Sequence, residues 1–445
     1  MDHEIAIPFR GVSVRREQVL DLMARSGFFV YLVFIFFGTE RPFDVSLQDQ
    51  VVPTSNILNQ SLSLLFLLSF ISLWGKLRQV VDVVGQEKFL ALFLGWVVVS
   101  MAWSDYPVVT LKRSVAVLGE SIICLAFLLR ARWSSDALRY LWIVAGVYIV
   151  LTVASVIIYP QGAIQWEFPA WSGLAPTKNN LGQISLFSIV ILMSVVAYNR
   201  GRIQNALHYV LLVLSIVALV GARSTTSFLV CAFLLIVGLL VRLGALSGSR
   251  KVAVVYTTIV TVTGVTLALF VFIFTPDFLA ALFGVFGKDM TFTGRVDLWE
   301  AVLAMTLDRM WQGWGFGAFW VMDGPHLTRL FQQFIWIPNQ AHQGYLDVYN
   351  QTGLIGFVLL LGMIAGYFRG VARVRTRQVW FWLVIAILVF NLQESLFFRP
   401  RHIGHFLFLF SYLALHTDAL REGGLKTPRA GPAYPHHEAP PPVES

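Results

Sequence analysis

The stretch that decides the fold, residues 137–159, reads ALRYLWIVAGVYIVLTVASVIIY. It holds a single charged residue, and about twenty predominantly apolar residues are what an α-helix needs to cross a bilayer. Similar stretches recur along the chain, which is 57% hydrophobic and 13% charged, whereas soluble proteins carry about a quarter charged residues. None of them alternates every second residue as a membrane β-barrel does. The sequence therefore predicts an all-α polytopic membrane protein.

Working outward from this stretch, we expect about twelve transmembrane helices. They cover approximately residues 20–38, 57–74, 89–103, 113–129, 137–159, 179–198, 207–222, 226–243, 253–274, 353–371, 379–395 and 403–417. The predicted organisation is an N-terminal segment (1–19), helices one to nine (20–274), one long loop with short helices (275–345), helices ten to twelve (346–420) and a tail (421–445). The tail is rich in Pro, Gly and His, a composition typical of disorder.

Lysine and arginine are distributed unequally between the two sides of the membrane. The N-terminal segment, the even-numbered connections and the tail together hold 22 of the 33 Lys and Arg residues. Basic residues accumulate in cytoplasmic connections, so both termini are expected in the cytoplasm. The long loop is then expected on the extracytoplasmic face, periplasmic in a cell with two membranes.

The long loop begins with a helical pattern at Arg295. Apolar residues recur there at spacings of three and four and form one stripe, namely Val296, Trp299, Leu303, Leu307 and Met310. An amphipathic helix lying on the membrane surface explains the stripe. It does not explain Arg295, because a cation is unfavourable at a helix N-terminus. We expect an anion beside Arg295, either a bound substrate or a neighbouring carboxylate.

Two further segments of the loop are candidates for binding or chemistry. Residues 311–320, WQGWGFGAFW, combine turn-forming glycines with aromatic faces such as Trp314, which suit either sugar stacking or the membrane interface. Asn339 is a plausible N-cap that places His342 in the first turn of a helix, with Tyr345 on the same face. The positive end of the helix dipole favours a neutral imidazole that can accept a proton. An isolated histidine is otherwise more often structural.

A few cations lie on the outer side against the charge rule. Arg223 occupies a short turn between two spans beside hydroxyl side chains, and Lys178 lies at the outer end of another span. A positive charge near the bilayer carries a desolvation cost, so such residues either extend to the interface or bind an anion. For Arg223 we consider anion binding and extension to the membrane interface equally well supported.

Several classes of function are excluded by the composition and motifs. The net charge of +8 is explained by cytoplasmic anchoring, because no soluble basic segment with interleaved aromatics indicates nucleic acid binding. Cys124 and Cys231 lie in expected spans and imply neither a disulfide framework nor a metal cluster. The sequence contains no HExxH, Walker A, GxSxG or DxD motif. We therefore expect no metal and no cofactor.

The motifs resemble those of the O-antigen ligase/Wzy polymerase superfamily, in particular its exopolysaccharide-polymerase (ExoQ-like) branch. The resemblance is carried by Thr293-Gly-Arg-Val-Asp-Leu-Trp299, Gly313-Trp-Gly-Phe-Gly317, Asn339-Gln-Ala-His-Gln-Gly-Tyr-Leu346 and Thr352-Gly-Leu-Ile-Gly356. Thr177-Lys-Asn-Asn-Leu-Gly182 resembles the branch's His-Lys-Asn motif, with Thr177 in place of histidine. The resemblance covers nearly the whole membrane region.

The resemblance implies a GT-C-like fold and a glycosyltransferase of the bacterial inner membrane that is inverting and independent of metal. Its donor would be an undecaprenyl-diphosphate-linked glycan on the periplasmic side. His342 would be the catalytic residue, and Arg223 and Arg295 would hold the diphosphate. Lys178 and Asn179 would contribute to the same donor site. Trp314 and Tyr345 are the candidates for sugar contacts.

We expect a polymerase that joins lipid-linked repeat units into exopolysaccharide, and three alternatives stay open. An O-antigen ligase would transfer the glycan to lipid A core, and a scaffold of a secretion complex would use the loop for docking. A polysaccharide or lipid-linked-glycan transporter would need Glu120, which we interpret instead as a hydrogen-bonded carboxyl facing another helix. The expected partners are the lipid-linked donor, a glycan or lipid A core acceptor and the bilayer, with a flippase and a chain-length regulator as further candidates.

Overall fold

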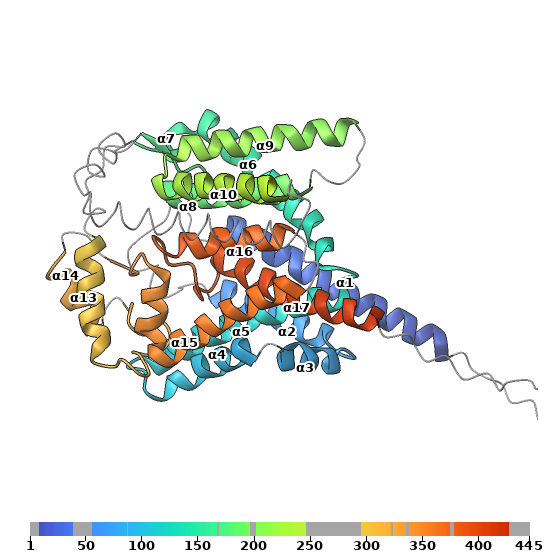
Figure 1. Ribbon diagram of the computed structural model, residues 1–445, viewed down its shortest axis with the longest axis horizontal. Helices are drawn as coiled ribbons and strands as arrows, with labels where there is room; N and C mark the ends of the chain where they lie inside the picture. Colours follow the sequence, from blue (N-terminus) through green and yellow to red (C-terminus); the bar gives the residue numbers. More distant parts are fainter. Residues whose placement is uncertain are drawn as a thin grey trace, which may run out of the picture.

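A computed structural model describes residues 9–38, 56–86, 88–166, 169–195, 202–245, 295–321, 324–334, 338–373 and 378–426. Over these residues the chain is built almost entirely from α-helices, most of which run side by side in one bundle (Figure 1). The only strands described are the short antiparallel pair β1 (Ile164–Gln165) and β2 (Ala170–Trp171). The predicted class, an all-α polytopic membrane protein, is confirmed.

The helices of the bundle follow the apolar stretches of the sequence. They are α1 (Phe9–Phe37), α2 (Asn56–Ser72), α3 (Leu77–Gln86), α4 (Lys88–Val99), α5 (Pro107–Arg130), α6 (Ala137–Ile158), α8 (Lys178–Val195), α9 (Arg202–Ala222), α10 (Thr225–Ala245), α15 (Gly344–Arg373), α16 (Gln378–Phe390) and α17 (Ile403–Lys426). Short helices α7 (Pro160–Ala163), α13 (Arg295–Leu307) and α14 (Pro325–Phe331) lie outside the long spans.

The expected count of twelve spans is not confirmed. Among the described residues, six helices are long and apolar enough to cross a membrane, or seven if the bent pair α2 and α3 forms one span. Shorter apolar helices cover Lys88–Ala102 and Val379–Phe390. The ninth expected span, residues 253–274, lies outside the described residues, and a helix overlaps each of the others. Helix α17 continues to Lys426, beyond the expected start of the tail.

Helix α17 is the centre of the bundle, because 89% of its span is buried, whereas α10 is 17% buried. Aromatic side chains of α1 and α5 pack against it. Phe28 of α1 stacks on Phe127 of α5 with ring centroids 4.2 Å apart, and Phe410 of α17 lies 5.1 Å from Phe28. Large rings bury much apolar area and fix the helices relative to one another.

Helix α5 joins the two ends of the bundle. Asp105, just before its first turn, pairs with Arg309 of the long loop at 2.9 Å. Arg130, its last residue, pairs with Glu17 at 3.0 Å and Asp21 at 2.7 Å, both on α1. A helix rises about 1.5 Å per residue, so the N-terminal part of α1 and the long loop lie at opposite ends, as Figure 1 shows.

A break in α15 shapes the loop end of the bundle. Gly353 has φ 67° and ψ −172°, values that only glycine adopts readily. The loop segment 310–315 supplies hydrogen-bond partners for backbone groups on both sides of the break. Trp314 N–H donates to Asn350 O at 3.1 Å and Gly315 N–H to Gln351 O at 3.0 Å. Leu354 N–H donates to Met310 O at 2.8 Å. The glycine-rich motif therefore brings the loop backbone onto the broken helix.

The start of α15 corrects one sequence prediction. His342 was expected in the first turn of a helix capped by Asn339, but the helix begins at Gly344 and His342 has φ 51°. A residue in this left-handed region cannot continue an α-helix. His342 is therefore presented by a tight turn that precedes α15.

Candidate active site

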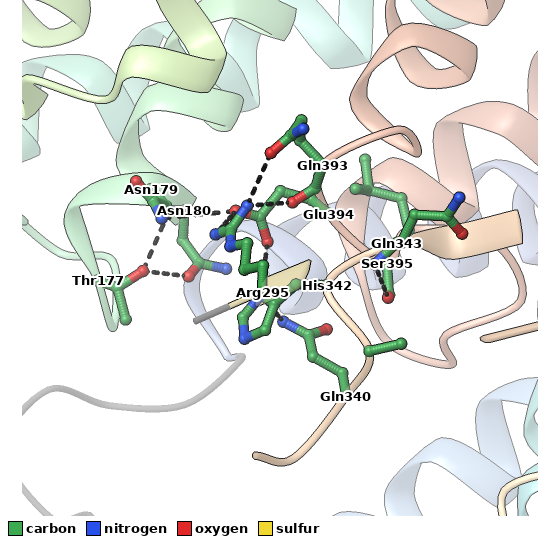
Figure 2. A network of polar contacts seen from close by, with 12 residues as sticks. Thr177, Asn179, Asn180, Arg295, Gln340, His342, Gln343, Gln393, Glu394 and Ser395 are labelled. Atoms are coloured by element: carbon green, nitrogen blue, oxygen red, sulfur yellow. Dashed lines mark hydrogen bonds and ion pairs between the residues drawn. The ribbon is translucent and has the colours of Figure 1, made fainter. Parts of the chain in front are cut away.

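Glu394 is the centre of a polar network that joins three of the sequence-predicted residues (Figure 2). Its Oε1 lies 3.2 Å from the Arg295 guanidinium, and its Oε2 lies 3.3 Å from His342 Nδ1. Asn179 Nδ2 donates to Oε1 over 3.4 Å. The Glu394 side chain is only 7% exposed, and a buried carboxylate requires such partners. One acid thus holds together a histidine, an arginine and an amide.

Arg295 is the first residue of α13 and faces the segment that follows α16. Its guanidinium donates to the Gln393 carbonyl oxygen at 2.6 Å and to Gln393 Oε1 at 3.2 Å, besides the Glu394 contact. The carboxylate offsets the unfavourable position of a cation at a helix N-terminus. Of the two anions expected beside Arg295, the neighbouring carboxylate is therefore present.

His342 is held in its left-handed conformation by the backbone on both sides. Ala341 O accepts a hydrogen bond from Trp299 Nε1 at 2.8 Å, and Gln343 N–H donates to Ser395 Oγ at 3.1 Å. A non-glycine residue in this region costs about 1–3 kcal/mol and persists where its surroundings fix it. Strain of this kind is concentrated at functional sites, and here it directs the His342 ring toward Glu394.

The network determines which ring nitrogen of His342 can accept a proton. Gln340 Oε1 accepts from Arg399, which turns the Gln340 amide nitrogen toward His342 Nδ1 at 3.1 Å. Glu394 is the stronger partner of Nδ1 because it carries a charge, so Nδ1–H donates to Glu394, and the Gln340 amide nitrogen then contacts the ring without a hydrogen bond, since both nitrogens carry hydrogen. In the tautomer that donates Nδ1–H to Glu394, His342 Nε2 is unprotonated and can accept a proton. The side chain is 21% exposed, so the ring is not sealed from a substrate.

The electrostatics favour an ionised Glu394. Burial alone would raise the pKa of this carboxyl, but the hydrogen bond and charge of His342, followed by those of Arg295, hold its pKa below its usual range. The carboxylate is therefore ready to stabilise a proton that arrives on His342.

Thr177 and Lys178 begin α8 on the other side of Glu394. Thr177 Oγ1 accepts a hydrogen bond from Asn180 N–H at 3.2 Å, so the residue that replaces the family histidine caps α8. Lys178 is the first residue of α8 and lies outside the six candidate spans. Burial and the charge of nearby Arg223 lower its pKa. Two cations and a helix N-terminus thus lie together, an arrangement that favours anions.

Arg223 occupies the turn between α9 and α10 with φ 46°. It lies at an apolar groove of about 350 Å³ that is lined by Pro169, Trp171, Ile216, Val217, Val220 and Gly221. Arg223 acts electrostatically on Lys178, whose neighbour Asn179 donates to Glu394. The predicted residues therefore form two adjoining groups, one with the histidine and one with Arg223.

The two candidates for sugar contacts lie in packed surroundings. Trp314 is 9% exposed, donates to Met305 O at 3.1 Å and has the Arg309 guanidinium 4.3 Å above its ring. Tyr345 donates its hydroxyl to Leu388 O at 3.0 Å, and its ring packs on Phe397. Both side chains thus help to hold the loop and the start of α15 in place.

Sequence reasoning missed Glu394, Gln393 and Gln340. The available signal was an acid at the outer end of an expected span, 379–395, where a carboxylate needs a partner. The sequence analysis considered Glu120 as an acid inside a span that a transporter would use, and it did not consider Glu394. Its pairing with Arg295 joins residues 99 positions apart, which no local pattern reveals.

Comparisons with known proteins bear on the same residues. A family model described as O-Antigen ligase matches residues 210–361, a range that contains Arg223, Arg295 and His342 but not Glu394. The chain is also 24% identical over 368 residues to the exopolysaccharide production protein ExoQ of Rhizobium meliloti (strain 1021), with 78% of this chain and 82% of the relative covered. Both matches agree with the resemblance that the motifs carry: the chain is similar to ExoQ over most of its length, and its central part matches the O-antigen ligase family model.

Proposed function

We propose that the protein is an inverting glycosyltransferase that polymerises undecaprenyl-diphosphate-linked repeat units into exopolysaccharide on the periplasmic face of the bacterial inner membrane. The observation that carries the proposal is the contact of Glu394 with both His342 and Arg295. A base oriented by an acid, beside a guanidinium, suits attack by a hydroxyl on a donor with an anionic leaving group. The similarity to an exopolysaccharide production protein supports the product class.

In the proposed reaction His342 is the general base. Its Nε2 removes the proton from an acceptor sugar hydroxyl as the oxygen attacks the anomeric carbon from the face opposite the diphosphate. The new C–O bond forms as the bond to the diphosphate oxygen breaks, and the configuration inverts. The proton resides on the His342 ring, where the Glu394 carboxylate stabilises the imidazolium. The bonding electrons leave with the diphosphate.

Cationic residues receive the leaving group. Arg295 offers a planar fork of donors that fits phosphate oxygens, and it can exchange part of its contact with Glu394 and Gln393 for the donor. Arg223, Lys178 and Asn179 adjoin this position and complete the donor site. Guanidinium groups bind a diphosphate without a metal, so we propose metal-independent catalysis with no cofactor.

An O-antigen ligase is the second candidate, because the family model bears that description. The donor chemistry would be the same and the acceptor would be lipid A core. In either case the proposed topology has both termini in the cytoplasm. A flippase that delivers the donor and a chain-length regulator are the proposed protein partners.

The test replaces His342 and Arg295 by alanine in the producing cell, with Arg329→Ala as the matched control, since Arg329 is exposed on α14 of the same loop. We expect each site variant to lower polymer formation by about 10²-fold or more and to leave single repeat units on the lipid. The control should give normal polymer.

The measurement is the length distribution of surface polysaccharide at matched membrane levels of protein. Long polymer from both site variants would refute the assigned roles, and finished polymer retained on the lipid would favour the ligase.

A further inference from the structure

Glu120 lies in the middle of α5 with no exposed surface. Its Oε1 accepts hydrogen bonds from the Tyr31 hydroxyl of α1 and from the Arg401 backbone N–H, both at 2.6 Å. Its Oε2 lies 3.2 Å from His405 Nε2 of α17, an ion-pair distance without hydrogen-bond geometry. The interpretation of Glu120 as a hydrogen-bonded carboxyl facing another helix is confirmed. The sequence did not predict the hydrogen bond from the Arg401 backbone N–H.

Arg401 belongs to a strained turn, residues 398–402, between α16 and α17. Phe398 has φ 49° and Arg401 has φ 67°, both in the left-handed region that disfavours residues with a side chain. Such conformations cost free energy and persist only where the surroundings fix them. The Phe398 ring is fixed by stacking on Phe93, with centroids 4.0 Å apart. At Arg401 the Glu120 carboxylate accepts the backbone N–H.

The turn reaches the candidate active site through Arg399. Its guanidinium donates to Gln340 Oε1, and the Gln340 amide nitrogen lies 3.1 Å from His342 Nδ1. Glu120, the 398–402 turn, Arg399, Gln340 and His342 thus form one continuous series of contacts. This series begins on α5, whereas Glu394 lies in the segment directly after α16.

We propose that Glu120 is a positioning residue for His342 and acts by fixing the 398–402 turn from which Arg399 holds Gln340. The carboxylate serves as a hydrogen-bond acceptor and exchanges no proton with the substrate. The inference rests on the proposed function, since it assigns to Glu120 a part in orienting the base of that reaction. It also gives a role to a polar acceptor in the interior of the bundle, where a polar group without a partner is costly.

The first test compares Glu120→Ala with Glu120→Gln in the purified full-length chain. Glutamine keeps an Oε1 that can accept from Tyr31 and from Arg401 N–H, whereas alanine accepts neither. We expect Glu120→Ala to lower kcat by about tenfold, because displacements of about 1 Å at a reacting group cost up to ~10²-fold. Glu120→Gln should retain most of the activity. Equal loss in both variants would overturn the proposal, since a role of the negative charge would then be required.

A double-mutant cycle separates positioning from general destabilisation. If Glu120 acts through Gln340, Glu120→Ala and Gln340→Ala should each lower kcat by about tenfold. Glu120→Ala should then have little further effect in a Gln340→Ala protein, so the double variant stays near a tenfold loss. Independent effects would multiply to about a hundredfold loss and would contradict the proposal. Asp418→Ala is the matched control. This carboxyl is buried in α17 and accepts a hydrogen bond from Ser134 N–H at 3.1 Å, and its loss should not alter kcat per folded molecule.

Hydrogen exchange of the intact chain in nanodiscs provides a readout that needs no turnover. We expect faster exchange of the amides of residues 398–402 in Glu120→Ala, but not in Glu120→Gln or Asp418→Ala. Unchanged exchange in Glu120→Ala would overturn the role assigned to the turn. If the wild-type protein shows no polymerisation while exchange responds as expected, the proposed function fails and the structural link from Glu120 to the turn stands.

Discussion

At the scale of single residues, the account depends on the environment of His342. The sequence made both residues candidates, Arg295 because a cation is unfavourable at a helix N-terminus and His342 because it follows the plausible N-cap Asn339. The residue that connects them, Glu394, is buried and belongs to the connection between α16 and α17. A carboxylate that orients an imidazole and stabilises its protonated form is a recurrent feature of general-base catalysis.

Replacement of Glu394 by glutamine tests this arrangement. The amide can still contact Arg295 but carries no charge to stabilise a protonated His342. We expect kcat to fall by about 10–10²-fold, with a smaller change in KM for the donor, because the loss affects the transition state. Glu300→Gln, an exposed position on α13, is the control and should leave kcat unchanged. The rate of repeat-unit joining by purified protein is the measurement, and a wild-type kcat in Glu394→Gln would contradict the role of the carboxylate.

At the scale of elements, the sequence predicted helices better than their interruptions. Within the described residues a helix overlaps each apolar stretch that was expected to span, because the bilayer length constraint acts on the local sequence. The break at Gly353 and the turn at His342 were not predicted, since both depend on distant partners. The break relies on hydrogen bonds from residues 310–315, and the turn on Trp299 and Ser395. Patterns within one segment contain no information on such partners.

Gly353→Ala tests the broken helix. A Cβ at this position would meet the Trp311 carbonyl oxygen, and φ 67° with ψ −172° is strained for alanine. We expect the apparent unfolding temperature in detergent to fall by several degrees, from a cost of about 2 kcal/mol or more. Gly95→Ala in α4, where a Cβ has no neighbour within 4 Å, should be neutral or slightly stabilising. Size-exclusion chromatography after heating measures the midpoint, and equal midpoints for Gly353→Ala and the wild type would contradict the requirement for glycine.

At the scale of the whole molecule, the bundle separates two polar regions along α5. The pairs of Arg130 with Glu17 and Asp21 lie at one end, and the loop with α13, α14 and the Glu394 network lies at the other (Figure 1). This separation agrees with the charge-based topology, in which the N-terminus and the loop are on opposite sides of the membrane. The basic residues of the sequence predicted opposite ends for the two regions because the sorting rule depends on composition and needs no knowledge of packing, and the cytoplasmic location of the N-terminus stays a prediction.

The most direct test of the central claim is polymerisation by the purified chain in proteoliposomes. The substrate is the undecaprenyl-diphosphate-linked repeat unit extracted from the producing cell, supplied with a metal chelator and without nucleotides. We predict a ladder of polymer lengths with release of undecaprenyl diphosphate, and a rate at least ~10²-fold lower for His342→Ala. The same ladder from His342→Ala, or unconsumed repeat units with the folded wild-type protein, would contradict the account.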